Sequence, residues 1–234
     1  MSVDLSFWKE KEGVDLPVKE VYETACCDGQ LVEGLEELPI PAILAELETA
    51  YAKWERMDPV TWEKETGGGF QIFTTPQVFR VDSYGLPREE LAKFSEMMKG
   101  YGCPVYDPQQ GCRFDRLTVS LVGEAAVCRE AVEEMLPTLF PGLPFAIEEV
   151  PVPEGAVALP KPEHPALELF IHRGKNAAKI TANLFFGSGW ASRPTQCKLA
   201  LLTDEAETKA RFSKLAKTVI SRVAEDMRQR SYHR

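Results

Sequence analysis

The order in which hydrophobic periodicities follow one another in the first 106 residues is the feature that most limits the fold of this chain. Apolar residues alternate in Val3–Trp8, which predicts a strand. They alternate again in Phe70–Thr75 and Val78–Tyr84, on either side of a proline-containing turn, which predicts a hairpin. A fourth short strand is predicted at Cys103–Tyr106.

Three helices are predicted between these strands. The first begins at Pro17 and ends near Gly29, and the second extends from Pro39 to Met57. The third begins at Pro87, and its apolar face consists of Leu91, Phe94, Met97 and Met98. With one helix set aside, the order is β-α-β-β-α-β, which is that of a ferredoxin-like sandwich. The sequence therefore predicts an α+β fold with an acidic, ferredoxin-like domain in residues 1–116.

The second half predicts a smaller α/β domain over residues 117–234. Its predicted elements are a strand at Leu117–Val122, a helix at Ala125–Leu136, a strand at Pro144–Val150, a hairpin of Leu167–His172 with Ala178–Phe186, a strand at Gln196–Leu202 and a long C-terminal helix over 204–230. A single continuous sheet through both halves would produce the same pattern, so one domain remains the alternative.

The net charge of −9 is concentrated in the first half of the chain. Residues 1–116 carry 22 acidic and 12 basic side chains, whereas residues 117–234 carry 14 and 15. An acidic half argues against nucleic-acid binding, because Lys and Arg are needed to displace counterions from phosphates. It suits a basic protein partner, since opposite fields speed encounter, although acidic surfaces also serve solubility alone.

The sequence is typical of a cytoplasmic protein. Its N-terminus reaches charge too early for a signal peptide, and no apolar run approaches the roughly 18 to 20 residues that cross a bilayer. Six cysteines occur without a CxxC spacing, so we expect reduced thiols. No membrane contact is predicted.

The search for catalytic, cofactor and metal sites finds one candidate. Gly174-Lys175 lacks the glycine that a phosphate loop requires, and the three histidines have no metal-ligand spacing. Cys112 lies beside Arg113 and Asp115, and a neighbouring cation lowers the pKa of a thiol. A cytosolic enzyme with its site near these three residues is therefore the alternative to a binding protein. Otherwise we predict no catalytic residue, no metal and no cofactor.

Two loops and one acidic stretch are candidate surfaces for a protein partner. The segment 101–109 combines aromatics, prolines and polar residues, so that Tyr106, Asp107 and Gln109 are candidate contacts, although its tyrosines could also pack on the sheet. Trp190 lies among small residues in a second loop, where it either binds a partner or folds onto its own domain. The acidic candidates are Glu33, Glu36 and Glu37, just before a predicted helix.

Several segments of the first half resemble a group of small bacterial proteins. They are 1–9, 32–40, 79–85 and 102–109, together with Arg113-Phe114-Asp115. Members of this group are similar to immunity proteins, the antitoxins that neutralise toxins delivered between competing cells. The resemblance covers about 116 residues and none of the second half. It implies tight binding of a cognate toxin domain in the cytosol, and the acidic first half of the chain fits a basic toxin. A stress or scaffold protein is a third possibility.

Overall fold

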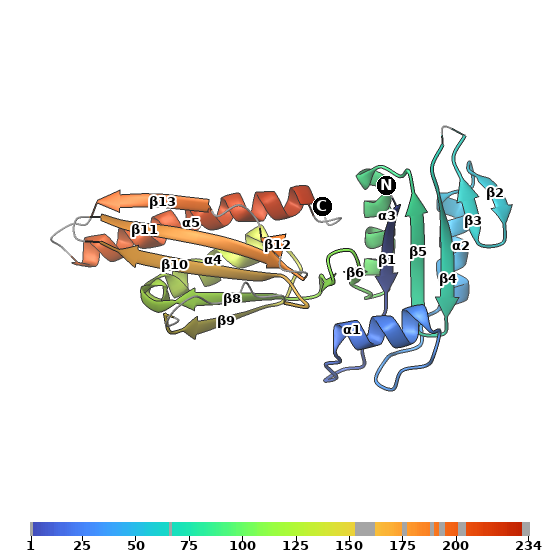
Figure 1. Ribbon diagram of the computed structural model, residues 1–234, viewed down its shortest axis with the longest axis horizontal. Coiled ribbons are helices and arrows are strands. Elements are labelled where there is room, and N and C mark those ends of the chain that lie inside the picture. The colour runs from blue at the N-terminus through green and yellow to red at the C-terminus, as the bar shows by residue number, and fades with distance from the viewer. Residues whose placement is uncertain are drawn as a thin grey trace. The chain divides into compact units, whose positions relative to one another are not determined.

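The computed structural model describes residues 2–65, 67–152, 162–174, 177–187, 190–191, 195–200 and 205–230. The chain has the mixed α+β architecture that the sequence predicts. It divides into two compact units, the first ending at Arg113 and the second beginning at Phe114. Figure 1 shows the elements of each unit.

The first unit is built on a seven-stranded antiparallel sheet with the order β2-β3-β4-β5-β1-β6-β7. Its strands are β1 (Ser2–Phe7), β2 (Glu55–Asp58), β3 (Thr61–Glu63), β4 (Gly69–Thr75), β5 (Val78–Tyr84), β6 (Val105–Asp107) and β7 (Cys112–Arg113). The order β6-β1-β5-β4 at its centre contains the split β-α-β arrangement, because β5 lies between β1 and β4 and is antiparallel to both. The ferredoxin-like prediction is thus confirmed for the central four strands.

Helices cover the two faces of this sheet unequally. On one face lie α2 (Ile40–Ala50) and α3 (Arg88–Gly100), as Figure 1 shows. Their core is aromatic: the Tyr51 ring lies 4.8 Å from the Phe70 ring and 5.4 Å from the Phe94 ring. On the opposite face a single short helix crosses the end of β1, starting as α1 (Val18–Val21) and continuing as the π-helix η1 (Tyr22–Cys27).

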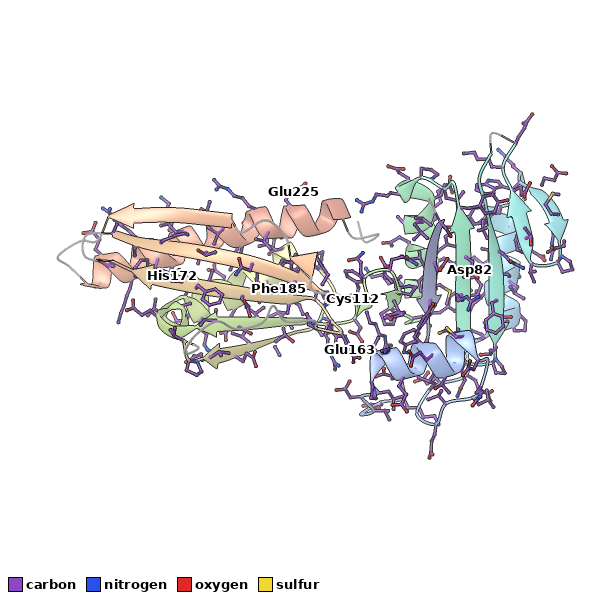
Figure 2. The ribbon with its side chains drawn as sticks, in the orientation of Figure 1. Asp82, Cys112, Glu163, His172, Phe185 and Glu225 are labelled. Carbon is purple, nitrogen blue, oxygen red and sulfur yellow. The ribbon has the colours of Figure 1, made fainter. Side chains whose placement is uncertain are left out.

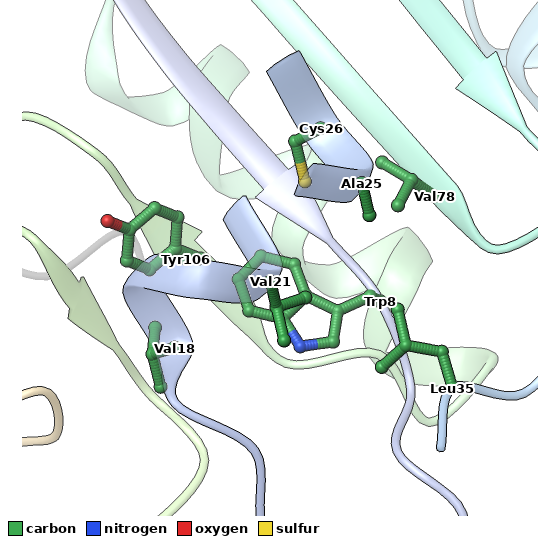
Figure 3. Close-up of a cluster of buried hydrophobic side chains, with 8 residues drawn as sticks. All are labelled: Trp8, Val18, Val21, Ala25, Cys26, Leu35, Val78 and Tyr106. Atoms are coloured by element: carbon green, nitrogen blue, oxygen red, sulfur yellow. The ribbon is translucent and has the colours of Figure 1, made fainter. Parts of the chain in front are cut away.

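A buried cluster joins this short helix to the sheet. Its centre is Trp8, which is fully buried and lies 5.3 Å from the Tyr106 ring. Figure 3 shows Trp8 surrounded by side chains from α1, η1, β5, β6 and the loop before α2, namely Val18, Val21, Ala25, Cys26, Leu35, Val78 and Tyr106. Burial of apolar surface stabilises by roughly 25 cal/mol per Å², so this cluster stabilises the packing of the short helix on the sheet.

The second predicted helix is shorter than expected. It ends at Ala50, and Glu55–Asp58 forms the edge strand β2 instead of its last turn. Trp54 continues the apolar spacing of the helix, but it packs from a turn, 4.9 Å from the Tyr51 ring and 5.7 Å from the Phe70 ring. The apolar spacing therefore continues into the turn that follows the helix. The helix ends before this turn because the next residues pair as strand β2 with β3.

In α3 the predicted core position of Phe94 is confirmed, since its side chain is 1% exposed. Met97 is only half-buried, and Met98 occupies the fully buried position next to it.

The second unit is a mixed sheet with the order β12-β11-β10-β8-β9, in which β13 also pairs with β11. Its strands are β8 (Leu117–Val122), β9 (Phe145–Val150), β10 (Ala166–Arg173), β11 (Ala177–Phe186), β12 (Trp190–Ala191) and β13 (Thr195–Ala200). Strand β8 is parallel to both β9 and β10, whereas β10 and β11 form the predicted antiparallel hairpin.

The helices of the second unit are the 3₁₀-helix η2 (Gly123–Cys128), α4 (Arg129–Leu139) and α5 (Glu205–Arg230). The last is the predicted long C-terminal helix. It packs on α4, β11 and β13, and its buried side chains include Phe212, Val219 and Ile220. Alternate residues of β8 and β10, such as Val119 and Leu169, are fully buried.

Candidate functional site

The short helix leaves part of one sheet face of the first unit open to solvent. Five side chains lie there, and we call them the open face: Asp4 on β1, Gln71 and Phe73 on β4, and Asp82 and Tyr84 on β5. Register places them together, because Asp82 is directly opposite both Asp4 and Gln71. Figure 2 labels Asp82 at this position. Phe73 is 36% exposed and Tyr84 is 43% exposed, so α1 and η1 do not extend over them.

Two carboxylates oppose each other at the centre of the open face. Asp4 and Asp82 are cross-strand partners in an antiparallel pair, where like charges are unfavourable. Partial burial raises the pKa of Asp4, and the charge of Asp82 raises it further. Nearby Arg80 acts in the opposite direction. A sheet that keeps such a pair departs from local stability rules, and departures of this kind concentrate at functional sites.

Arg80 neutralises one of the two carboxylates. Its Nε donates to Asp82 Oδ1 at 2.8 Å, and its Nη2 donates to Asp82 Oδ2 at 2.7 Å. A third bond, from Nη1 to the Cys26 carbonyl oxygen at 2.6 Å, ties the guanidinium to the end of η1. The guanidinium also lies 5.1 Å from the centre of the Phe73 ring. Arg80 is thus committed to Asp82, and the charge of Asp4 is the less compensated of the two.

The two aromatic side chains of the open face are held in fixed positions. Tyr84 lies across Gly69, its partner on β4, where an added Cβ atom would approach the Tyr84 hydroxyl oxygen to 2.8 Å. The Tyr84 hydroxyl donates to Glu63 Oε1. Phe73 is held between the Arg80 guanidinium and the turn at Gly29. Fixed aromatic rings lose little conformational entropy when a partner binds.

The three predicted glutamates lie in a loop of the first unit, before α2. Glu33 and Glu37 are exposed, as expected for contacts with a partner. Glu36 is half-buried and accepts a hydrogen bond from Lys9 Nζ at 2.6 Å, which also raises the pKa of Lys9. Of these three glutamates, Glu33 and Glu37 are therefore the more exposed.

The predicted contacts around residue 106 divide into buried and exposed residues. Tyr106 is 4% exposed and packs against Trp8 and Tyr22, so it contributes to the core. Asp107 is 1% exposed, and its Oδ1 accepts hydrogen bonds from the backbone nitrogens of Gln109 and Gln110. Burial raises the pKa of Asp107, and the bonds from Gln110 oppose that effect. Gln109 is the exposed member of the predicted set.

The remaining predicted contact, Trp190, begins strand β12, which pairs with the end of β11. Its side chain lies outside the described part of the chain.

The alternative site near Cys112 has a different character. Cys112 is fully buried in β7, so a substrate can reach this thiol only if the strand moves. The Arg113 guanidinium is 3% exposed, lies 4.8 Å from the centre of the Trp8 ring and donates to Glu10. Asp115 belongs to the second unit, where its Oδ1 lies 2.6 Å from His164 Nδ1.

Cys26, Cys27, Cys103, Cys112 and Cys128 are free thiols, and all of these except Cys27 are buried. Burial raises the pKa of Cys26 to about 12 and that of Cys128 to about 11, so both stay protonated at neutral pH. Within the described ranges, no group of three or more His, Cys, Asp or Glu side chains is placed to hold a metal ion. In the same ranges, no helix combines the length and the apolar character that a membrane crossing requires.

Sequence patterns did not identify Asp4 and Asp82 as site residues. Each occupies an alternate position of a strand whose neighbouring residues are buried or apolar: Asp4 lies between Val3 and Leu5, and Asp82 lies between the buried residues Val81 and Ser83. That pattern indicates that both point away from the core, but only the strand register places them opposite each other.

No protein-family model matches the chain, and no curated protein matches it either. Among solved structures, a crystal structure of an uncharacterized protein is similar at 14% identity and a TM-score of 0.32, covering 49% of this chain and 93% of its own. A likeness at this level carries no argument about function.

Proposed function

We propose that this protein is an immunity-type protein, which binds a cognate toxin domain in the bacterial cytosol and neutralises it without chemistry of its own. The observation that carries the proposal is the opposed pair Asp4 and Asp82 on a sheet face that also exposes Phe73 and Tyr84. Interfaces draw most of their binding energy from a few anchored aromatic and charged side chains. The open face offers such a set.

The charge distribution supports a basic partner. The first half of the chain carries a net charge of −10, and Glu33 and Glu37 add exposed negative charge to the surface of the first unit. A basic toxin domain, such as one that must bind nucleic acid, would be attracted by this field before contact. The resemblance of the first 116 residues to immunity proteins points to the same class of partner.

The first experiment is identification of the partner. A pull-down with the full chain from its native organism should recover one protein in stoichiometric amount, and we expect it to be basic. Recovery of a metabolic enzyme complex or of no stoichiometric partner would contradict the proposal.

The second experiment measures association rates of that partner against ionic strength. Glu33→Lys with Glu37→Lys changes the net charge by four units and should slow association roughly tenfold at low salt. Glu36 is left unchanged because its reversal would place a second cation beside Lys9. A control variant, Glu55→Lys with Glu96→Lys, makes the same charge change at exposed positions of β2 and α3. Equal rates for wild type and both variants at every salt concentration would remove the electrostatic support for the proposal.

A further inference from the structure

The open face has the composition of a docking surface rather than of an ordinary solvated sheet face. An ordinary face of this kind carries scattered polar side chains that pair across strands. Here two fixed aromatic rings, Phe73 and Tyr84, flank the position of Asp82 along the sheet. Asp4 adds a carboxylate whose ionised form is destabilised by the nearby charge of Asp82. A cation placed between the rings would relieve that repulsion.

Arginine fits this arrangement better than lysine. A guanidinium is planar, so it stacks on aromatic rings and binds a carboxylate through two parallel hydrogen bonds. The open face already shows the geometry once: Arg80 binds Asp82 through two bonds while its guanidinium lies over Phe73. Asp4 and Tyr84 provide a carboxylate and a ring for a second guanidinium that comes from outside.

A second copy of this chain is a poorer occupant. A symmetric pairing of two open faces would bring Asp4 and Asp82 of both copies together and would add to the existing repulsion. Charge complementarity therefore favours a partner that brings positive charge.

We infer that the open face of the first unit is the docking surface for the partner protein, and that it receives an arginine side chain of that partner between Asp4 and Tyr84. This inference rests on the proposed function, because the partner is the one proposed above. It assigns the contact to particular residues, which the proposed function does not.

A peptide that alternates arginine and glycine over twelve residues serves as the first probe. Its affinity for the full-length protein is measured by NMR titration, in which shifts of the backbone amides also report the position of binding. Asp4→Asn is expected to weaken binding about tenfold, and Glu96→Gln, which removes one charge from an exposed residue of α3, less than twofold. Tyr84→Ala should weaken binding severalfold with no change of charge, and its backbone amide spectrum shows whether the fold is kept. The largest shifts are expected in β1, β4 and β5.

Three results would overturn the inference. Equal losses for Asp4→Asn and Glu96→Gln would mean that the peptide binds any acidic surface. Shifts confined to other elements would place binding elsewhere. A wild-type dimer in sedimentation that Tyr84→Ala converts to monomer would mean that a second copy occupies the face.

The partner from the pull-down separates this inference from the proposed function. If wild type and Asp4→Asn bind it with equal affinity, the docking surface is wrong and the proposed function stands. If wild type has no stoichiometric partner, the proposed function fails, and the peptide titration still decides whether the open face binds arginine.

Discussion

The Asp4 carboxylate opposes stability in a way that can be measured. Its pKa is raised from 3.8 in the folded protein, so the folded state holds this proton more tightly than the unfolded chain does. In the window between those two pKa values the folded state binds more protons, and the free energy of unfolding therefore falls as the pH rises. Above the raised pKa the free energy of unfolding falls no further on account of Asp4, so the wild-type protein is destabilised by the full amount at neutral pH.

Asp4→Asn should for this reason be more stable than wild type at pH 7. We expect a gain of up to about 0.5 kcal/mol, because the group is only partly buried and solvent screens its interactions. The gain should shrink as the pH falls to the raised pKa of the wild-type carboxyl group, below which Asp4 is protonated. Urea melts of both proteins at several pH values provide the measurement, with Glu33→Gln as a control that should show no such difference. A variant that is less stable than wild type at pH 7 would contradict the assigned cause.

The register between β1 and β5 explains why the sequence alone did not reveal this pair. The alternation of Val3, Leu5 and Phe7 predicts which residues face the core, and the structure confirms that Leu5 and Phe7 are fully buried. It also predicts that Asp4 and Asp82 face the other way. Their apposition depends on strand pairing across 78 residues of chain, which no local pattern encodes.

At the scale of elements, the junction between η1 and the following loop supports the open face. The π-helix ends in a turn in which the Gln30 nitrogen donates to the Thr24 carbonyl oxygen at 3.0 Å, and Gly29 adopts a φ of +70°. This left-handed conformation is costly for any residue with a Cβ atom. An added Cβ atom would also lie 3.4 Å from the Phe73 ring.

Gly29→Ala should therefore destabilise the protein by about 1–2 kcal/mol. Gly100→Ala is the matched control, because Gly100 ends α3 with no positive φ and a Cβ atom there would meet no atom within 4 Å. It should be neutral or stabilising by up to about 1 kcal/mol. Chemical denaturation of the two variants tests both statements, and equal effects would mean that the backbone at Gly29 is not strained by alanine.

Most elements followed from periodicity, and the exceptions have physical causes. The hairpin β4–β5, helix α3 and the long helix α5 lie close to their predicted bounds because each has a strong apolar pattern and clear ends. Strand β2 escaped prediction because all four of its residues are exposed, and an edge strand of charged residues has no apolar alternation. The open face was not predicted because it depends on how much of the sheet α1 and η1 cover, and only the tertiary packing shows this.

At the scale of the whole molecule, each unit has its own sheet and its own buried core. We therefore expect two unfolding transitions rather than one. Phe94→Ala removes a ring from the core of the first unit and should cost it about 3–5 kcal/mol, whereas Ile220→Ala should cost the second unit about 2–5 kcal/mol. Calorimetry should show that each variant lowers the midpoint of a different transition. A single transition lowered by both variants would show that the units unfold together.

The strand pairing also sets an order of events during synthesis. Strand β1 finds both of its partners, β5 and β6, by residue 107, so the central strands of the first sheet can pair once the ribosome has released that part of the chain. Strand β8 must wait for β10, whose paired residues end at Phe170. At about 5–20 residues per second, translation separates these two stages by several seconds. Over that interval the nascent chain already presents the open face. The partner can therefore bind the first unit before synthesis of the second unit is complete.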